Sequence, residues 1–278
     1  MQVSQAVHCW LEYHRSHSKK NTIRSYEFIG GRLCKHFDGR AVDSIKTDEV
    51  LTFLNTINKS TKPYTRKGRY SYLTSFFNFI INNVDQEFHN PCDSPMLRKI
   101  FRSHQKTHWK VFEKELVDEI IFRTTKHRNR LLLELMARGG MRVSEVLHLR
   151  PQDVDDRKLI LREPKSGKEY EVVYIPQKIA DRLKEYIQQK TIKPHERIFP
   201  ISYGAARIIV LTAGQLVGIK LRPHDLRRHA ATYASRSGVP IEIVSKVILR
   251  HANLSTTQRY LGKVSDVEAI RWIENVYG

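Results

Sequence analysis

The stretch RPHDLRRHAATYASRSG, residues 222–238, predicts a helix that begins at a proline and ends at a glycine. Proline is favoured in the first turn of a helix, and glycine just after its end. His224 and Arg227 are three residues apart, so they share one face of the first turn. That turn also presents backbone N–H groups and the positive end of the helix dipole, which suit a phosphate. An ordinary exposed helix start with charges explains these residues equally well.

The segment that follows, VPIEIVSKVIL at residues 239–249, has the spacing of an amphipathic helix that ends near His251. Its apolar side chains are predicted to face inward. They are Ile243, Val244, Val247 and Ile248.

The stretch LRHANLSTTQRYLG, residues 249–262, predicts a further short helix. Ser255 and Gln258 have the spacing of a capping box, which places the helix start at Thr256 and Tyr260 in the second turn. A short helix with few apolar anchors can move, so we expect Tyr260 on an adjustable arm.

Two glycines in ARGGMRVSEVLHL, residues 137–149, end one helix just before another begins. Arg142 and Glu145 then lie on the first turn of the second helix. A pair with this spacing is commonly a simple ion pair.

A hairpin is predicted by RKLILREPKSGKEYEVVYIP, residues 157–176, where strand alternation flanks a P-K-S-G-K turn. Lys165 lies in the turn, and Lys168 competes with it for any chemical role. A lysine in such a turn is by default solvated.

Composition points to a polyanionic partner. The chain has 278 residues, enough for two domains, and 48 Lys and Arg residues against 29 Asp and Glu residues give a formal charge of +19. The cationic surplus is spread along the chain, so double-stranded DNA is the expected partner, with a merely basic surface as the alternative. The three cysteines form no CxxC pair, and no apolar run is long enough to span a membrane, so we expect a cytoplasmic protein without membrane association.

The pattern along the chain predicts a helical domain at residues 1–90, a linker at 91–110 and a second domain at 111–278. The helical spacing of the first domain is clearest at Leu73, Phe76, Phe77 and Ile80. A basic cluster at the start of the same helix favours contact with DNA phosphates, with a solvated helix end as the alternative. Its members are Lys62, Arg66, Lys67 and Arg69.

The motifs in their order along the chain resemble the catalytic domain of the tyrosine recombinases, the superfamily of phage integrase, Xer and Cre. The matching residues are Arg142, Glu145, Lys165, His224, Arg227, His251 and Tyr260. The resemblance implies a mainly α fold with a small β-sheet: an N-terminal helical, SAM-like core-binding domain and a C-terminal α+β catalytic domain. One residue departs from the family pattern, because Arg250 precedes His251 where the family usually has glycine, and we expect Arg250 to add a DNA contact.

The resemblance also implies a mechanism. Tyr260 attacks the scissile phosphodiester to give a 3′-phosphotyrosyl intermediate and a free 5′-hydroxyl, and Lys165 is the general acid. Arg142 and Arg227 hold the non-bridging oxygens, His224 and His251 bind the phosphate or transfer protons, and Glu145 orients its neighbours. Strand exchange between two sites then needs neither ATP nor metal nor another cofactor. The resemblance implies a homotetramer on DNA, with accessory DNA-bending proteins as further partners. The apolar C-terminal segment, with Val267, Ile270, Trp272 and Ile273, is expected either to exchange between neighbouring copies or to fold back on its own domain.

Elementary chemistry agrees with those roles. A phenol with a pKa of about 10 is only about one part in a thousand ionised at pH 7, a cost of roughly 4 kcal/mol. Tyr260 therefore needs nearby cations or a base, and the two arginines also stabilise the charge of a five-coordinate phosphorus.

Three other functions are compatible with parts of the sequence. A type IB topoisomerase uses a similar residue set but acts as a monomer without a partner site. A non-enzymatic DNA-binding regulator would have an incidental tyrosine. Zinc held by His224 and His229 is disfavoured, because their spacing is poor for one helical face.

Overall fold

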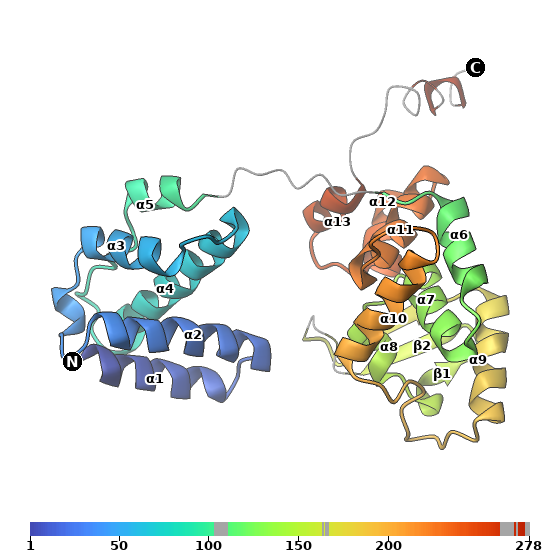
Figure 1. Cartoon of the computed structure of the whole chain (residues 1–278), viewed down its shortest axis with the longest axis horizontal. Coiled ribbons are helices and arrows are strands. Elements are labelled where there is room, and N and C mark those ends of the chain that lie inside the picture. The colour runs from blue at the N-terminus through green and yellow to red at the C-terminus, as the bar shows by residue number, and fades with distance from the viewer. Residues whose placement is uncertain (103–110, 163, 165–166, 262–269, 271, 276–278) are drawn as a thin grey trace. The chain divides into compact units, whose positions relative to one another are not determined.

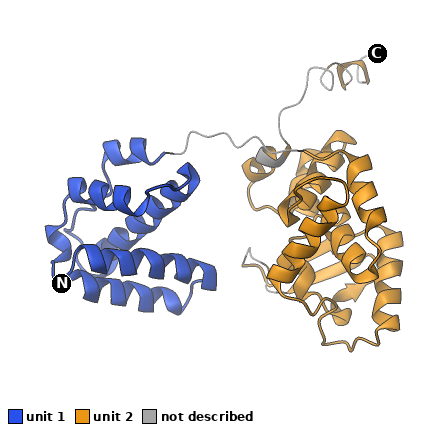
Figure 2. Cartoon of the chain, in the orientation of Figure 1, with its two compact units in different colours: residues 1–107 blue, residues 108–278 orange. Residues whose placement is uncertain are grey.

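The computed structural model describes residues 1–102, 111–162, 164, 167–261, 270 and 272–275, with the backbone alone at Arg259 and Tyr260. The chain divides into two compact units, residues 1–107 and 108–278 (Figure 2). No helix in this described part is long and apolar enough to cross a membrane.

Unit 1 is a set of helices around an aromatic core. Trp10 is fully buried, and its ring stacks on Tyr26 with the centroids 4.3 Å apart. The helical stripe predicted from the sequence is buried, as expected: Leu73, Phe76, Phe77 and Ile80. The described elements are α1 (Val3–Arg15), α2 (Lys20–His36), η1 (Val42–Ser44), α3 (Thr47–Ile57), α4 (Pro63–Asn83) and α5 (Pro95–Ile100) (Figure 1).

The core of unit 1 extends past the boundary expected at residue 90. Cys92, Leu97 and Phe101 are buried in the same aromatic core, and the Tyr70 hydroxyl donates to the Cys92 carbonyl oxygen over 2.8 Å. The first part of the predicted linker, residues 91–110, therefore packs within unit 1. Helix α5 has only six residues, too few to show a helical period in the sequence.

Unit 2 combines helices with a small antiparallel sheet. Helix α7 lies at its centre, with its residues from Leu131 to Ala137 buried. The mainly helical fold with a small sheet confirms the predicted fold class. The described elements are α6 (Lys114–Arg123), α7 (His127–Arg138), α8 (Val143–His148), η2 (Pro151–Asp153), β1 (Val154–Asp155), β2 (Lys158–Arg162), β3 (Tyr170–Tyr174), α9 (Gln177–Gln189), α10 (Tyr203–Gln215), α11 (Pro223–Arg236), α12 (Ile241–Ile243), η3 (Val244–Ile248) and α13 (Leu254–Leu261).

The sheet has the order β1-β2-β3, and the hairpin predicted from the sequence forms β2 and β3. Both strands alternate between exposed and buried residues, as a half-buried strand should. Leu159 pairs with Val173, and Leu161 with Glu171, so the inward face carries one carboxylate among apolar side chains.

The double-glycine turn between α7 and α8 brings three parts of unit 2 together. Gly140 has a φ of +59°, which glycine adopts without strain. A Cβ at this position would lie 2.8 Å from the carbonyl oxygen of Ile248. The turn therefore needs glycine both for its backbone shape and for its close approach to the chain near His251.

The segment after α11 differs from the predicted amphipathic helix. Only Ile241–Ile243 form an α-helix, and η3 continues as a π-helical turn in which Leu249 N–H donates to Val244 O over 2.9 Å. The wider turn buries Val244 and Leu249, whereas Ile243 is exposed, so the prediction that Ile243 faces inward is wrong.

Helix α13 begins two residues before the predicted start at Thr256. Its cap is Asn253, whose side-chain oxygen accepts the Ser255 N–H over 2.9 Å. Asparagine and serine are comparable N-cap residues, so spacing alone did not identify the right one. Tyr260 still lies in the second turn of the helix.

Candidate active site

Arg227 is the most deeply buried charged group of the site. It lies in the first turns of α11, with 1% of its surface exposed. Its two terminal nitrogens donate to the carbonyl oxygens of Gly140 and Leu249, and Nη1 lies 3.9 Å from Glu145 Oε2. The turn at Gly140 and the chain before His251 thus hold Arg227 from two sides.

Arg142 and Glu145 form a closed pair at the start of α8. Glu145 accepts the Arg142 backbone N–H over 2.8 Å and the Arg142 guanidinium over 2.5 Å. Burial alone would raise the pKa of Glu145, but the guanidinium groups of Arg250, Arg142 and Arg227 outweigh burial and lower it. Glu145 is therefore an anion shared by three arginines.

The position of Arg250 does not support the DNA contact that was predicted for it. Its side chain is 4% exposed, and Nη2 donates to Glu145 over 2.8 Å while Nε lies 3.5 Å from Glu171 of β3. The backbone has a φ of +51°, a left-handed shape that explains why glycine suits this position. Because the guanidinium points inward to two carboxylates, it is not placed to contact DNA.

Two histidines, His224 and His251, lie beside these arginines, and the pKa of each is lowered. The pKa of His251 is lowered to about 4 by burial first and then by the charges of Arg227, Arg142 and Arg250, with a smaller contribution from His224. Burial, followed by Arg228 and Arg227, also lowers the pKa of His224, which keeps an exposed surface in the first turn of α11. Both rings are thus neutral at pH 7 in the free protein.

Two buried hydroxyl groups lie next to His251, and neither was predicted from the sequence. His251 Nδ1 lies 3.0 Å from Thr257 Oγ1, and Thr257 donates to Ser245 Oγ over 2.9 Å. Thr257 lies in the S-T-T run of α13, but only its full burial distinguishes it from the neighbouring hydroxyl residues. Glu171 was not predicted either, because only its burial distinguishes it from other carboxylate residues.

Lys165 lies outside the described residues, so its predicted role stays a prediction. Of Tyr260 the structure describes only the backbone, within α13. Lys168 is exposed after the turn of the hairpin.

The basic cluster of unit 1 divides into two kinds of residue. Lys62 and Lys67 are exposed at the start of α4. Arg66 lies over the Phe101 ring at 5.9 Å. Arg69 lies over Phe28 at 4.7 Å and donates to the Ile57 carbonyl oxygen, so it joins α4 to neighbouring helices.

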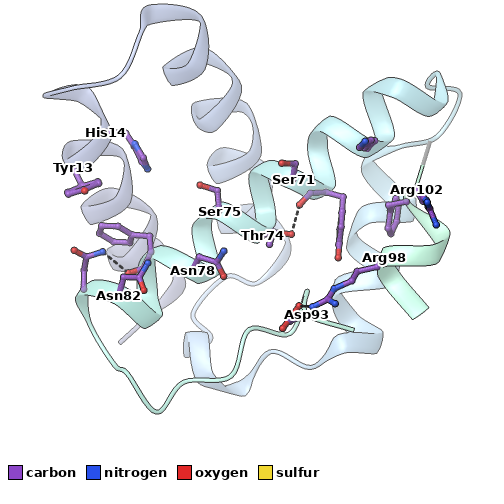
Figure 3. Close-up of a pocket in the computed structure, with 15 residues that line it drawn as sticks. Tyr13, His14, Ser71, Thr74, Ser75, Asn78, Asn82, Asp93, Arg98 and Arg102 are labelled. Carbon is purple, nitrogen blue, oxygen red and sulfur yellow. Dashed lines mark hydrogen bonds and ion pairs between the residues drawn. The ribbon is translucent and has the colours of Figure 1, made fainter. Parts of the chain in front are cut away.

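Unit 1 also contains a hollow of about 680 Å³. Figure 3 shows amide and hydroxyl side chains of α4 lining it, with an ion pair between Arg98 and Asp93 at one end. Lys67 is among the lining residues, but none of the predicted catalytic residues is.

The described residues contain no group of three His, Cys, Asp or Glu side chains that could hold a metal ion. His229, considered above as a partner of His224 for zinc, is buried, and its Nδ1 lies 2.9 Å from the Phe112 carbonyl oxygen. This contact ties α11 to the start of unit 2.

In this mainly helical unit with a small sheet, two arginines, a shared carboxylate and two histidines lie beside a short helix that carries a tyrosine. The sequence model of the phage integrase family matches residues 111–265. The chain therefore belongs to the phage integrase family, as the resemblance predicted, and its enzyme class is that of the tyrosine recombinases.

Curated relatives agree over most of the chain. Tyrosine recombinase XerA of Pyrococcus horikoshii is 29% identical over 93% of this chain and 90% of its own length. Tyrosine recombinase XerC of Lacticaseibacillus casei is 31% identical over 80% of this chain and 79% of its own length.

Solved structures share the fold. The integrase of transposon Tn1549 in complex with a circular intermediate DNA has a TM-score of 0.75 and 16% identity, covering 99% of both chains. A lambda integrase dimer bound to a core site has a TM-score of 0.74 and 16% identity, covering 96% of this chain and all of the other.

Proposed function

We propose that the chain is a site-specific DNA recombinase that cleaves and rejoins duplex DNA through a 3′-phosphotyrosyl intermediate formed on Tyr260. The observation that carries the proposal is the convergence of Arg142, Arg227 and His251 next to the helix of Tyr260. These groups are close enough for both guanidiniums to depress the pKa of the histidine. Such a field stabilises both a phenolate and the developing charge on phosphorus.

Each residue has a separate role. Arg142 and Arg227 bind the non-bridging oxygens of the scissile phosphate, and Glu145 orients the two guanidiniums. His224 and His251 contact the phosphate or transfer protons. Lys165 protonates the leaving 5′-oxygen, with Lys168 as its competitor for this role. No metal takes part, so activity persists in EDTA.

The DNA-binding part of the proposal rests on charge and on relatives. The chain carries a formal charge of +19, and Lys62 and Lys67 are exposed on unit 1. The related Tn1549 and lambda integrases were solved on DNA, and lambda integrase also as a tetramer on a Holliday junction. We propose that unit 1 is a core DNA-binding domain and that four copies of this chain assemble on two DNA sites. The proposal includes an accessory DNA-bending protein as a further partner in that assembly.

The first experiment traps the covalent intermediate. Wild type and Tyr260→Phe are incubated with suicide DNA substrates made from sequences that flank the protein's own gene, and the products are separated on denaturing gels. The matched control is Tyr203→Phe, which removes an exposed phenol on α10. A protein–DNA adduct in wild type and control but not in Tyr260→Phe is expected. An adduct that survives in Tyr260→Phe would remove Tyr260 from the nucleophile's role.

A second experiment identifies the general acid. Lys165→Ala is expected to lose cleavage of ordinary DNA and to regain it when sulfur replaces the 5′ leaving oxygen, since a thiolate leaves without a proton. Lys168→Ala is the matched variant. Recovery in Lys168→Ala alone would transfer the role to Lys168.

The recombinase is distinguished from a strand-passing topoisomerase by its products. Joining of strands from two separate duplexes that carry the site is expected. Relaxation of supercoiled DNA without any such joint product would favour the topoisomerase reading. Binding without an adduct in every substrate would favour a non-enzymatic DNA-binding protein.

A further inference from the structure

Three polar side chains form a chain of hydrogen bonds between α13, which carries Tyr260, and the π-helical turn η3. They are His251, Thr257 and Ser245. Ser245 and Thr257 have no exposed surface, and His251 has 9%. His251 Nδ1 lies 3.0 Å from Thr257 Oγ1, and Thr257 Oγ1 lies 2.9 Å from Ser245 Oγ. Thr257 stands three residues before Tyr260 on α13, so its hydroxyl links this helix directly to the histidine.

The direction of these hydrogen bonds restricts the proton on the histidine. A threonine hydroxyl carries one proton, and Thr257 donates it to Ser245. The oxygen of Thr257 is then an acceptor toward His251, so Nδ1 must carry a proton to make the 3.0 Å contact. In a neutral ring the other nitrogen, Nε2, then has no proton and is an acceptor.

We propose that Thr257 is a positioning residue that docks α13 against η3 and fixes His251 as the tautomer with its proton on Nδ1. Ser245 is a second positioning residue, because it accepts the Thr257 proton and so determines the direction of the relay. The chemical consequence, which rests on the proposed function, is that Nε2 of His251 accepts the phenolic proton of Tyr260.

The charges around His251 make this role dependent on substrate. Burial and the guanidiniums of Arg227, Arg142 and Arg250, together with His224, disfavour the imidazolium in the free protein. A scissile phosphate adds a negative charge among these guanidiniums and offsets their effect. His251 therefore becomes a stronger base once DNA is bound.

The proton balance of the cleavage step follows from this assignment. The Tyr260 oxygen forms a bond to phosphorus while its proton moves to Nε2 of His251. The bond between phosphorus and the 5′-oxygen breaks, and that oxygen takes a proton from the general acid proposed above. Rejoining runs the same transfers in reverse, so His251 returns the proton to the phenol.

Four variants separate the parts of the relay. Thr257→Val removes the hydroxyl at nearly constant volume, and Thr257→Ser keeps it. Ser245→Ala leaves the contact of Thr257 with His251 but removes the acceptor of the Thr257 proton. Thr256→Val is the matched control on the same helix, because its hydroxyl makes no hydrogen bond among the described residues.

The first readout is the single-turnover rate of adduct formation on saturating suicide DNA. Thr257→Val is expected to slow this step about 10- to 100-fold, within the usual effect of proton transfer by a positioned side chain. Ser245→Ala is expected to slow it about 3- to 10-fold, while Thr257→Ser and Thr256→Val stay within about threefold of wild type. DNA affinity is expected to change little in all four.

The second readout is the tautomer of His251 in the full chain without DNA, from long-range ¹H–¹⁵N NMR correlations of labelled histidine. The His251 signals among the 13 histidines are identified by their loss in His251→Gln. Wild type is expected to carry the proton on Nδ1, and Ser245→Ala and Thr257→Val to show a mixture of the two tautomers.

The two readouts distinguish failure of the positioning proposal from failure of the proposed function. A wild-type His251 with its proton on Nε2 overturns the proposal whatever the enzyme activity. The same holds if Thr257→Val cleaves at the wild-type rate, or if Thr256→Val is as slow as Thr257→Val. If wild type forms no adduct on any site, the proposed function fails, while the tautomer still tests the positioning role. If Thr257→Val does not fold, Ser245→Ala and the wild-type tautomer decide.

Discussion

Replacing Arg250 by methionine tests the buried ion cluster that Arg250 forms with Glu145 and Glu171. The family usually has glycine at this position. The guanidinium is 4% exposed and serves Glu145 and Glu171, whose side chains are 10% and 7% exposed. Removing one member of a buried ion cluster typically costs about 3–5 kcal/mol, because the remaining charges lose their partner. We expect Arg250→Met to lower the free energy of unfolding of unit 2 by that amount at pH 7.

A glycine at the same position separates the charge from the backbone. Arg250 has a φ of +51°, and a left-handed backbone costs an ordinary residue about 1–2 kcal/mol. Arg250→Gly removes this strain together with the guanidinium, so it should be about 1 kcal/mol more stable than Arg250→Met. Arg123→Met is the control, because its surface pair with Glu119 is half exposed and should matter by about 1 kcal/mol or less.

The assay is urea unfolding followed by hydrogen exchange of the amides of α7 and α8, which reports unit 2 alone. The penalty of Arg250→Met should shrink as the pH falls from 7 toward about 4, because Glu145 without this cation takes up a proton more readily. A penalty below about 1 kcal/mol, or one that does not change with pH, would contradict the buried-cluster reasoning.

Three other predictions concern separate parts of the chain. Gly140→Ala should cost at least about 2 kcal/mol and abolish cleavage, since its Cβ would meet Ile248 at 2.8 Å, whereas Gly31→Ala, with open space around it, should be neutral or stabilising in urea unfolding. The pKa of His251 falls from 6.5 to about 4 on folding, so the free energy of unfolding should drop as the pH falls from 6.5 to 4. In His251→Gln this dependence on pH should be weaker, and an unchanged dependence would contradict the lowered pKa. A thiol reagent should label exposed Cys9 quickly and buried Cys92, whose pKa is raised to about 12 by burial, only on unfolding; equal rates would contradict its burial.

The local patterns predicted most of the elements. The helix from Pro223 and the hairpin appear where proline, glycine and strand alternation indicated them. The arginine–carboxylate pair of Arg142 and Glu145 also forms, because its geometry depends only on one helical turn. Features that depend on a few neighbouring residues were therefore readable from the sequence.

Other features depend on contacts between distant parts of the chain, and the sequence did not show them. The π-helical turn at Val244–Ile248 lies against Gly140 and α11, so its wider period follows from packing. The inward direction of Arg250 is set by Glu145 and by Glu171, residues 105 and 79 positions earlier in the chain. Thr257 differs from its hydroxyl neighbours only in burial.

The carbonyl oxygen of Gly140 accepts hydrogen bonds from Arg227 and from Arg250, which lies 110 positions later. Chains are synthesised from the N-terminus, and contacts across so long a separation form late. A ribosome-bound chain that stops before residue 250 has Glu145 with Arg142 and Arg227, but it lacks Arg250, the cation that lies between Glu145 and Glu171. The buried ion cluster around Glu145 is therefore one of the last parts of unit 2 that a nascent chain can complete.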